Sequence, residues 1–190
     1  MGTSPLATNR IAAEDDQPKL LRSEGARERL AKLYTEYARF VGWFASRLLT
    51  RPDEVEDIVQ EVFLIAATNL ERLTDPPQIR GWLKTVALRR AARKLRWKRV
   101  RARFGVANPP VGVDEIVAAP GATPEDRAAL SELFAVLERM PTDLRLAWSL
   151  RYMHEETVES VAELCGCSLA TAKRRISAAQ GRINEELSDG

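Results

Sequence analysis

The chain has 190 residues, 45% hydrophobic and 29% charged, so it is globular and long enough for one large core or two small ones. Its formal net charge of +2, from 29 basic and 27 acidic residues, does not by itself indicate a nucleic-acid binder. No apolar run is long enough to span a membrane, and residues 1–16 lack the apolar centre of a secretory signal. We therefore expect a soluble, cytoplasmic protein without membrane insertion.

The two cysteines, Cys165 and Cys167, are too close in sequence for an ordinary structural disulfide, which indicates a reducing compartment. With His154, the only histidine, they offer three metal ligands and no fourth, and small thiols more often fill a helical core. We expect no metal and no other cofactor. Since no nucleophile arrangement surrounds His154 and no glycine-rich phosphate loop is present, the sequence also predicts no catalytic site.

The first part of the chain divides into a leader and a helical segment. Residues 1–25 are polar with little periodicity, which predicts a mobile leader. The segment 26–104 has apolar residues at three- and four-residue spacing, interrupted near prolines. One or two packed helices are predicted over about 26–49, and single helices over about 53–70 and 79–104. The last of these contains many lysines and arginines and no acidic residue between Arg80 and Arg103, which points to nucleic acid.

The second part begins after a stretch rich in proline and glycine. Residues 105–123 have no helical period and predict a flexible linker. A helix then starts at Pro124 with Thr123 as its cap, and Thr142 with Asp143 is predicted to cap the next one. Strand-like alternation is absent from the sequence. We therefore expect an all-α protein of two small helical domains, 26–104 and 124–190.

A helix-turn-helix is predicted at the end of the second domain. Thr157 suits the N-cap of a first short helix, Gly166 its left-handed C-cap, and Ser168 the N-cap of a second helix. Leu169, Ala172 and Ile176 are expected to face inward. The candidate DNA contacts on the remaining surface are Ser168, Thr171, Lys173, Arg174, Arg175 and Ser177. The same pattern also fits an antiparallel helix pair with a solvated basic face.

The helix predicted from Asp53 has two different faces, because successive helical residues are separated by about 100°. The core side carries Val55, Ile58, Val62 and Ile65. The opposite side carries Asp57, Gln60, Glu61 and Leu64. Two acids, an amide and a leucine in one patch suit a basic partner helix, although they also fit a solvated face with one exposed leucine.

The segment from Asp57 to Phe63 reads DIVQEVF and resembles the D-x-x-Q-E-x-F signature of bacterial RNA polymerase sigma factors. Trp82-Leu83, a basic helix, a Pro/Gly linker and a terminal helix-turn-helix follow it. This order is similar to that of the extracytoplasmic-function (ECF) group of the sigma-70 family, whose members have only the second and fourth conserved regions. The resemblance covers about Leu30 to Leu187.

The resemblance implies a role for each segment. Region 2-like residues 26–104 would bind core RNA polymerase and the −10 element, and region 4-like residues 124–190 the −35 element. Asp57, Gln60, Glu61 and Leu64 match positions that dock on the clamp helices of the polymerase largest subunit. The implied −10 contacts, with Trp97 stacking on an unpaired base, are Arg80, Lys84, Arg89, Arg90, Arg93, Lys94, Arg96 and Trp97.

Two implications concern function as a whole. The chain would be an initiation factor without catalytic activity whose partners are core RNA polymerase, promoter DNA and an anti-sigma factor. Arg89 and Arg93 stand where many members have Asn and Asp, so the −10 sequence does not transfer from the family. The alternative is a stand-alone helix-turn-helix regulator that binds a palindromic site as a dimer, which would not need the sigma-like acidic motif.

Overall fold

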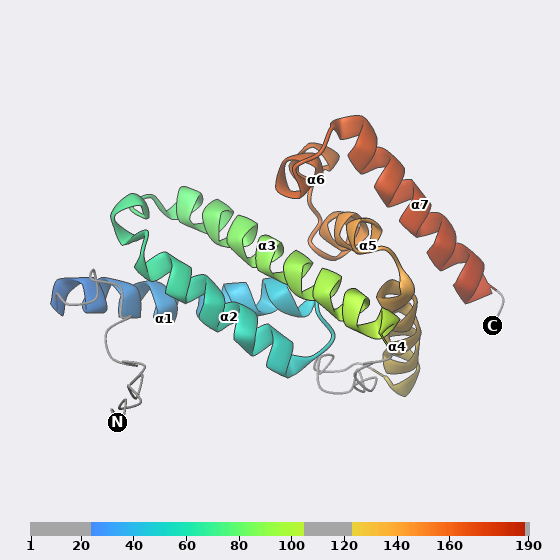
Figure 1. Ribbon diagram of the computed structural model, residues 1–190, viewed down its shortest axis with the longest axis horizontal. Coiled ribbons are helices and arrows are strands. Elements are labelled where there is room, and N and C mark those ends of the chain that lie inside the picture. The colour runs from blue at the N-terminus through green and yellow to red at the C-terminus, as the bar shows by residue number, and fades with distance from the viewer. Residues whose placement is uncertain (1–23, 105–122, 189–190) are drawn as a thin grey trace, which may run out of the picture.

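The computed structural model describes residues 24–104 and 123–188, and within these residues every regular element is a helix (Figure 1). This confirms the predicted all-α fold. The leader 1–25 and the linker 105–123 lie almost entirely outside the described residues. None of the helices within the described ranges is long and apolar enough to cross a membrane.

The N-terminal group contains three long helices: α1 (Glu24–Ser46), α2 (Pro52–Ala67) and α3 (Pro76–Arg103), with a short 3-10 turn at Leu70–Arg72. The segment 26–49 is thus a single helix with a short tail. Helix α3 begins three residues earlier than predicted, because the Asp75 carboxylate accepts a hydrogen bond from the backbone N–H of Gln78 and two prolines occupy the first turn.

The C-terminal group contains α4 (Pro124–Arg139), α5 (Thr142–Trp148), a π-helical turn at Ser149–Met153, α6 (Val158–Cys165) and α7 (Leu169–Ser188). The predicted cap at Thr123 is present as a capping box with Asp126. The predicted cap at Thr142 and Asp143 is wrong. Pro141 occupies the N-cap position without a side-chain bond, which places both residues inside the first turn of α5.

The helix-turn-helix forms as predicted. The Thr157 hydroxyl accepts from the N–H of Ser160, Gly166 adopts φ 62°, and the Ser168 hydroxyl accepts from the N–H of Thr171. Ala172 and Ile176 are buried, whereas Leu169 is 39% exposed, so its predicted inward position is wrong. Leu169 is the first residue of α7. This end of the helix extends beyond the core that covers Ala172 and Ile176.

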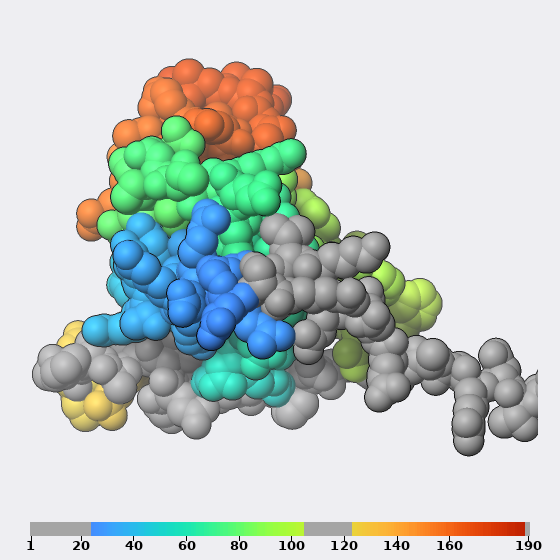
Figure 2. All heavy atoms as spheres, turned by 90° about the vertical axis from the view of Figure 1, so that its left-hand side faces the viewer, coloured from blue at the N-terminus to red at the C-terminus, as the bar shows by residue number. Residues whose placement is uncertain are grey.

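One hydrophobic core runs through both helical groups. Leu146, Leu150 and Val161 of the C-terminal group join the same buried cluster as Phe44 and Leu83 of the N-terminal group. A second, smaller cluster lies between α4, α5 and α7. Figure 1 accordingly shows α5 beside α3, and in Figure 2 the orange C-terminal atoms lie directly against green atoms of the N-terminal group. The two groups therefore pack as one body.

The turn of the helix-turn-helix provides a test of this local structure. A Cβ at Gly166 would meet no atom within 4 Å, so Gly166→Ala adds only the strain of a left-handed backbone. We expect the free energy of unfolding to fall by about 1–2 kcal/mol. Gly181→Ala is the matched control, because its Cβ is equally unobstructed but lies within α7, where alanine should raise stability by up to about 1 kcal/mol. Urea denaturation measures both, and equal effects would contradict the assigned strain.

Candidate functional surfaces

The predicted acidic patch is formed on one face of α2. Ile58 and Val62 are fully buried on the opposite face, which turns Asp57, Gln60, Glu61 and Leu64 away from the core. Leu64 is 63% exposed, far more than a core leucine. Helical periodicity alone therefore located this patch, and the structure brings its four residues together.

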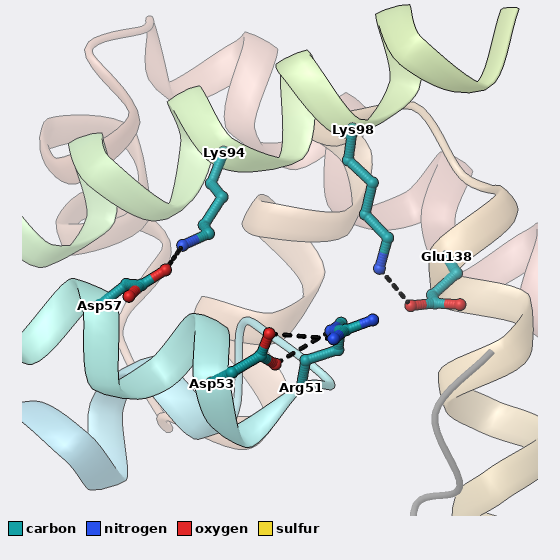
Figure 3. A network of polar contacts seen from close by, with 6 residues as sticks. All are labelled: Arg51, Asp53, Asp57, Lys94, Lys98 and Glu138. Atoms are coloured by element: carbon teal, nitrogen blue, oxygen red, sulfur yellow. Dashed lines mark hydrogen bonds and ion pairs between the residues drawn. The ribbon is translucent and has the colours of Figure 1, made fainter. Parts of the chain in front are cut away.

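The two acids of the patch contact the basic helix α3. The Asp57 carboxylate lies 2.6 Å from the Lys94 ammonium, as Figure 3 shows, and the Glu61 carboxylate lies 3.4 Å from the Arg90 guanidinium. All four side chains are partly exposed, and ion pairs of this kind contribute at most about 1 kcal/mol each. The acids can thus exchange these partners for others at small cost.

The predicted −10 residues divide between two faces of α3. Arg90, Arg93, Lys94 and Trp97 line a hollow together with Glu61 and Leu64 of α2. Trp97 is 59% exposed, whereas Trp82 is partly buried against the core. This first face combines positive charge with an exposed aromatic ring, which is the combination that binds single-stranded nucleic acid.

The second face of α3 points toward the C-terminal helices. Lys84 forms an ion pair with Glu156, and Arg96 lies 3.5 Å from the Asp143 carboxylate. Arg89 lines a hollow shared with α5, α6 and α7. Arg80 lies apart from these residues, with its guanidinium 4.6 Å from the centre of the Phe40 ring. The predicted set is therefore not one continuous surface.

Helix α7, the predicted recognition helix, exposes most of its predicted contacts. Lys173, Arg174 and Ser177 are exposed, and the Ser168 and Thr171 hydroxyls lie 2.9 Å apart at the helix N-terminus. Arg175 differs, because its guanidinium donates to the Asp143 carboxylate at 2.8 Å. Asp143 thus holds Arg175 with one oxygen and Arg96 with the other.

Sequence analysis missed Arg145, which lies between the two helical groups. Its side chain is only 3% exposed, and it donates a hydrogen bond of 2.8 Å to the backbone oxygen of Leu48. Burial lowers the pKa of Arg145 to about 10, opposed by the carboxylates of Glu138 and Glu54, so the guanidinium stays charged at neutral pH. The sequence signal that could have revealed this residue is an arginine placed among apolar residues.

The sequence raised His154 as a metal ligand and as a catalytic residue, and the structure gives it another place. Its ring stacks on Phe44 at 4.3 Å between centroids and meets the edge of Trp43 at 5.3 Å. Neither ring nitrogen has a hydrogen-bond partner in the described residues. Burial lowers the pKa of His154 to about 4, and the positive charges of Arg47 and Lys84 act in the same direction against Glu156.

The cysteines are free thiols, partly buried against the main core. Burial, followed by the neighbouring Cys167, raises the pKa of Cys165 to about 11, so this thiol is neutral at pH 7 and weakly nucleophilic. Within residues 24–104 and 123–188, no three His, Cys, Asp or Glu residues converge in a way that would hold a metal ion. Both thiols thus contribute to the packing of the main core.

Comparison with known proteins gives consistent matches to both helical groups. The family models described as sigma-70 region 2 and sigma-70, region 4 match residues 33–101 and 130–180. The ECF RNA polymerase sigma-E factor of Escherichia coli is 29% identical over 168 residues, covering 82% of this chain and 84% of the relative. The ECF sigma factor EcfG of Rhodopseudomonas palustris is 27% identical over 146 residues, 76% of this chain and 77% of the relative.

The fold is shared with a solved structure. The sigma factor RpoE of Bartonella quintana, solved in complex with the anti-sigma factor NepR, superposes with a TM-score of 0.63 at 24% identity. The match covers 83% of this chain and 96% of that one. The arrangement of helices is therefore common to both proteins.

The buried histidine makes stability depend on pH. Because the folded pKa of about 4 lies below the ordinary value of 6.5, the unfolded chain takes up the proton first, and stability falls as the pH drops through this window. Between pH 7 and pH 5 we expect a loss of about 1–2 kcal/mol from this group. His154→Phe, which keeps a ring in the same site, should remove most of the pH dependence. Urea denaturation at both pH values decides, and an unchanged slope in the variant would contradict the assignment.

Proposed function

Because this chain belongs to the sigma-70 family of RNA polymerase factors, in its extracytoplasmic-function group, we propose that it directs core RNA polymerase to promoters by recognising −35 and −10 elements and assisting duplex opening. The chain contributes binding, and the polymerase performs the chemistry. The observation that carries this proposal is the exposed patch of Asp57, Gln60, Glu61 and Leu64, which a protein that only binds DNA would not need.

The patch on α2 supplies the polymerase contact. Asp57 and Glu61 exchange Lys94 and Arg90 for basic side chains of the polymerase, while Leu64 packs between the two surfaces. Polymerase docking then releases Lys94 and Arg90 beside Trp97, where they bind phosphates of the separated −10 strand. Binding of polymerase thus prepares the adjacent DNA-binding face.

The recognition helix supplies the duplex contact. Lys173, Arg174 and Ser177 of α7 read base edges of the −35 element in the major groove. Ser168 and Thr171 hold phosphate at the helix N-terminus. Arg175 supports the helix through Asp143. Domains 26–104 and 124–190 accordingly bind the two promoter elements.

An anti-sigma factor is the third proposed partner. The relative from Bartonella quintana was solved with such a protein, and this chain has the same helical arrangement. We expect the partner to cover surfaces of both helical groups.

Removing the acids of the patch tests the polymerase contact. We expect Asp57→Ala/Glu61→Ala to lower affinity for purified core RNA polymerase at least tenfold, which corresponds to about 1.4 kcal/mol. Promoter-specific run-off transcripts from a pool of randomised promoters should decrease in parallel. The control is Glu56→Ala/Glu71→Ala, which removes two other exposed acids of the N-terminal group and should leave both measurements unchanged.

Two results would contradict the polymerase contact. One is equal core binding by the patch variant and the control. The other is specific DNA binding by the free wild-type chain together with no binding to core polymerase, which would indicate a stand-alone regulator.

The −35 contact is tested on α7. Arg174→Ala should weaken binding to a selected −35 sequence by about 1–3 kcal/mol, because arginine pairs with a guanine edge. Arg182→Ala removes the same charge from an exposed position two turns later on α7 and should change binding much less. Transcription from promoters mutated one base at a time measures the effect, and a uniform loss over all sequences would reassign Arg174 to phosphate.

A further inference from the structure

The last two turns of α3 carry an exposed apolar stripe. Trp97 is 59% exposed, Val100 42% and Phe104 80%, and within the described residues none of the three joins either hydrophobic cluster. Successive helical residues are about 100° apart, so these three positions share one side of the helix, and the buried Leu95 lies on the opposite side. Apolar side chains that are grouped on the surface in this way mark a binding surface.

Unpaired positive charge lies along the same side of α3. Arg93 and Arg101 are exposed, four residues before and four residues after Trp97. Among the described residues neither guanidinium pairs with an acid, whereas Lys94 does. Residues 80–103 also contain no acid. The stripe therefore favours an anionic ligand, and these two guanidinium groups need not leave another partner before they bind it.

A planar ligand with regularly spaced charges fits this stripe. Trp97 and Phe104 are seven residues apart, which is a rise of about 10.5 Å along a helix with 1.5 Å per residue. Consecutive nucleotides of one stacked strand rise by about 3.4 Å, so this distance matches about three nucleotides. In an unpaired strand the base faces are open to aromatic side chains, and the phosphates are open to arginine. A duplex hides its base faces, so the stripe favours unpaired DNA.

The position of the stripe favours the same ligand. Arg93 and Trp97 also line the hollow that contains Leu64, so the stripe continues the face already proposed to bind the separated strand. A protein partner would have to supply carboxylates for both arginines as well as apolar contacts. A nucleic-acid strand supplies a phosphate and a planar ring with every nucleotide.

We propose that the end of α3 is a second binding site for unpaired DNA, in which Phe104 stacks on a base and Arg101 binds a neighbouring phosphate. The inference rests on the proposed −10 contact, because the strand would reach Phe104 from Trp97. It adds two residues to the DNA-binding face and lengthens the bound strand by about three nucleotides. A strand held over this greater length is kept from pairing again with its complement.

Removal of the ring tests the stacking contact in the full-length chain. Wild type and Phe104→Ala are titrated at low salt with a fluorescein-labelled oligo(dT) long enough to span both rings, followed by fluorescence anisotropy. We expect Phe104→Ala to lower affinity about fivefold or more, because stacking on one base is lost. Phe104→Trp should keep the affinity, and Phe104→Leu, which is apolar but has no ring, should lose it. The matched control is Tyr152→Ala, which removes a half-exposed ring from the other helical group.

Removal of one charge tests the phosphate contact. In Arg101→Gln the slope of log affinity against log salt concentration should fall by about 0.7, the value for one phosphate of a single strand. Arg127→Gln removes the same charge from an exposed position of α4 and should leave the slope unchanged. A blunt duplex of the same length separates stacking from charge, because Phe104→Ala and Tyr152→Ala should bind it equally.

Three results would overturn the proposal. One is equal oligo(dT) affinity in Phe104→Ala and the Tyr152→Ala control, or no binding by the wild type. Another is full affinity in Phe104→Leu, which would show that the contact is apolar and does not involve stacking. The third is a loss of core polymerase binding in Phe104→Ala with unchanged oligo(dT) affinity, which would assign the stripe to a protein partner.

Failure of this inference is distinct from failure of the proposed function. If Trp97→Ala weakens oligo(dT) binding and Phe104→Ala does not, the proposed −10 contact stands and only its extension is lost. No polymerase is present in the oligo(dT) titrations, so they do not depend on polymerase binding by Asp57 and Glu61.

Discussion

The charge of Arg145 determines how the two helical groups pack. A guanidinium in a nearly closed interior costs several kcal/mol unless hydrogen bonds and opposite charges surround it. The backbone oxygen of Leu48 supplies the bond, and Glu54 and Glu138 supply the charge. Leu48 and Glu54 belong to the N-terminal group, so this environment exists only when α5 lies against it. Glu138 also lies 3.0 Å from Lys98, so it takes part both in the surroundings of the buried charge and in a surface ion pair.

The nearly neutral net charge conceals an ordered distribution. Acids approach α3 from both sides, Asp57 and Glu61 from α2 and Glu138, Asp143 and Glu156 from the C-terminal group. In the proposed function, polymerase docking exchanges the first set for basic side chains of the polymerase. Since exposed ion pairs such as Asp57–Lys94 and Glu61–Arg90 are individually weak, that exchange faces no large electrostatic barrier.

Features set by neighbouring residues were predictable from sequence. The caps at Thr157 and Ser168, the left-handed Gly166 and the acidic face of α2 depend on contacts within a few residues or on helical periodicity. The errors at Thr142 and Leu169 both lie in the first turn of a helix. There a residue that fits the sequence pattern of a cap or a core position takes a different place in the structure. The partners of Lys84, Arg96 and Arg145 lie 72, 47 and 97 residues away. Nothing in a local pattern indicates partners so distant in the sequence.

Asp143 also limits how this protein can diverge. It contacts Arg96 of α3 and Arg175 of α7, so a substitution at either arginine also removes a contact among α3, α5 and α7. A lineage that replaces either arginine must compensate at Asp143 or lose that contact. The sequences of α3 and α7 therefore diverge together through one carboxylate.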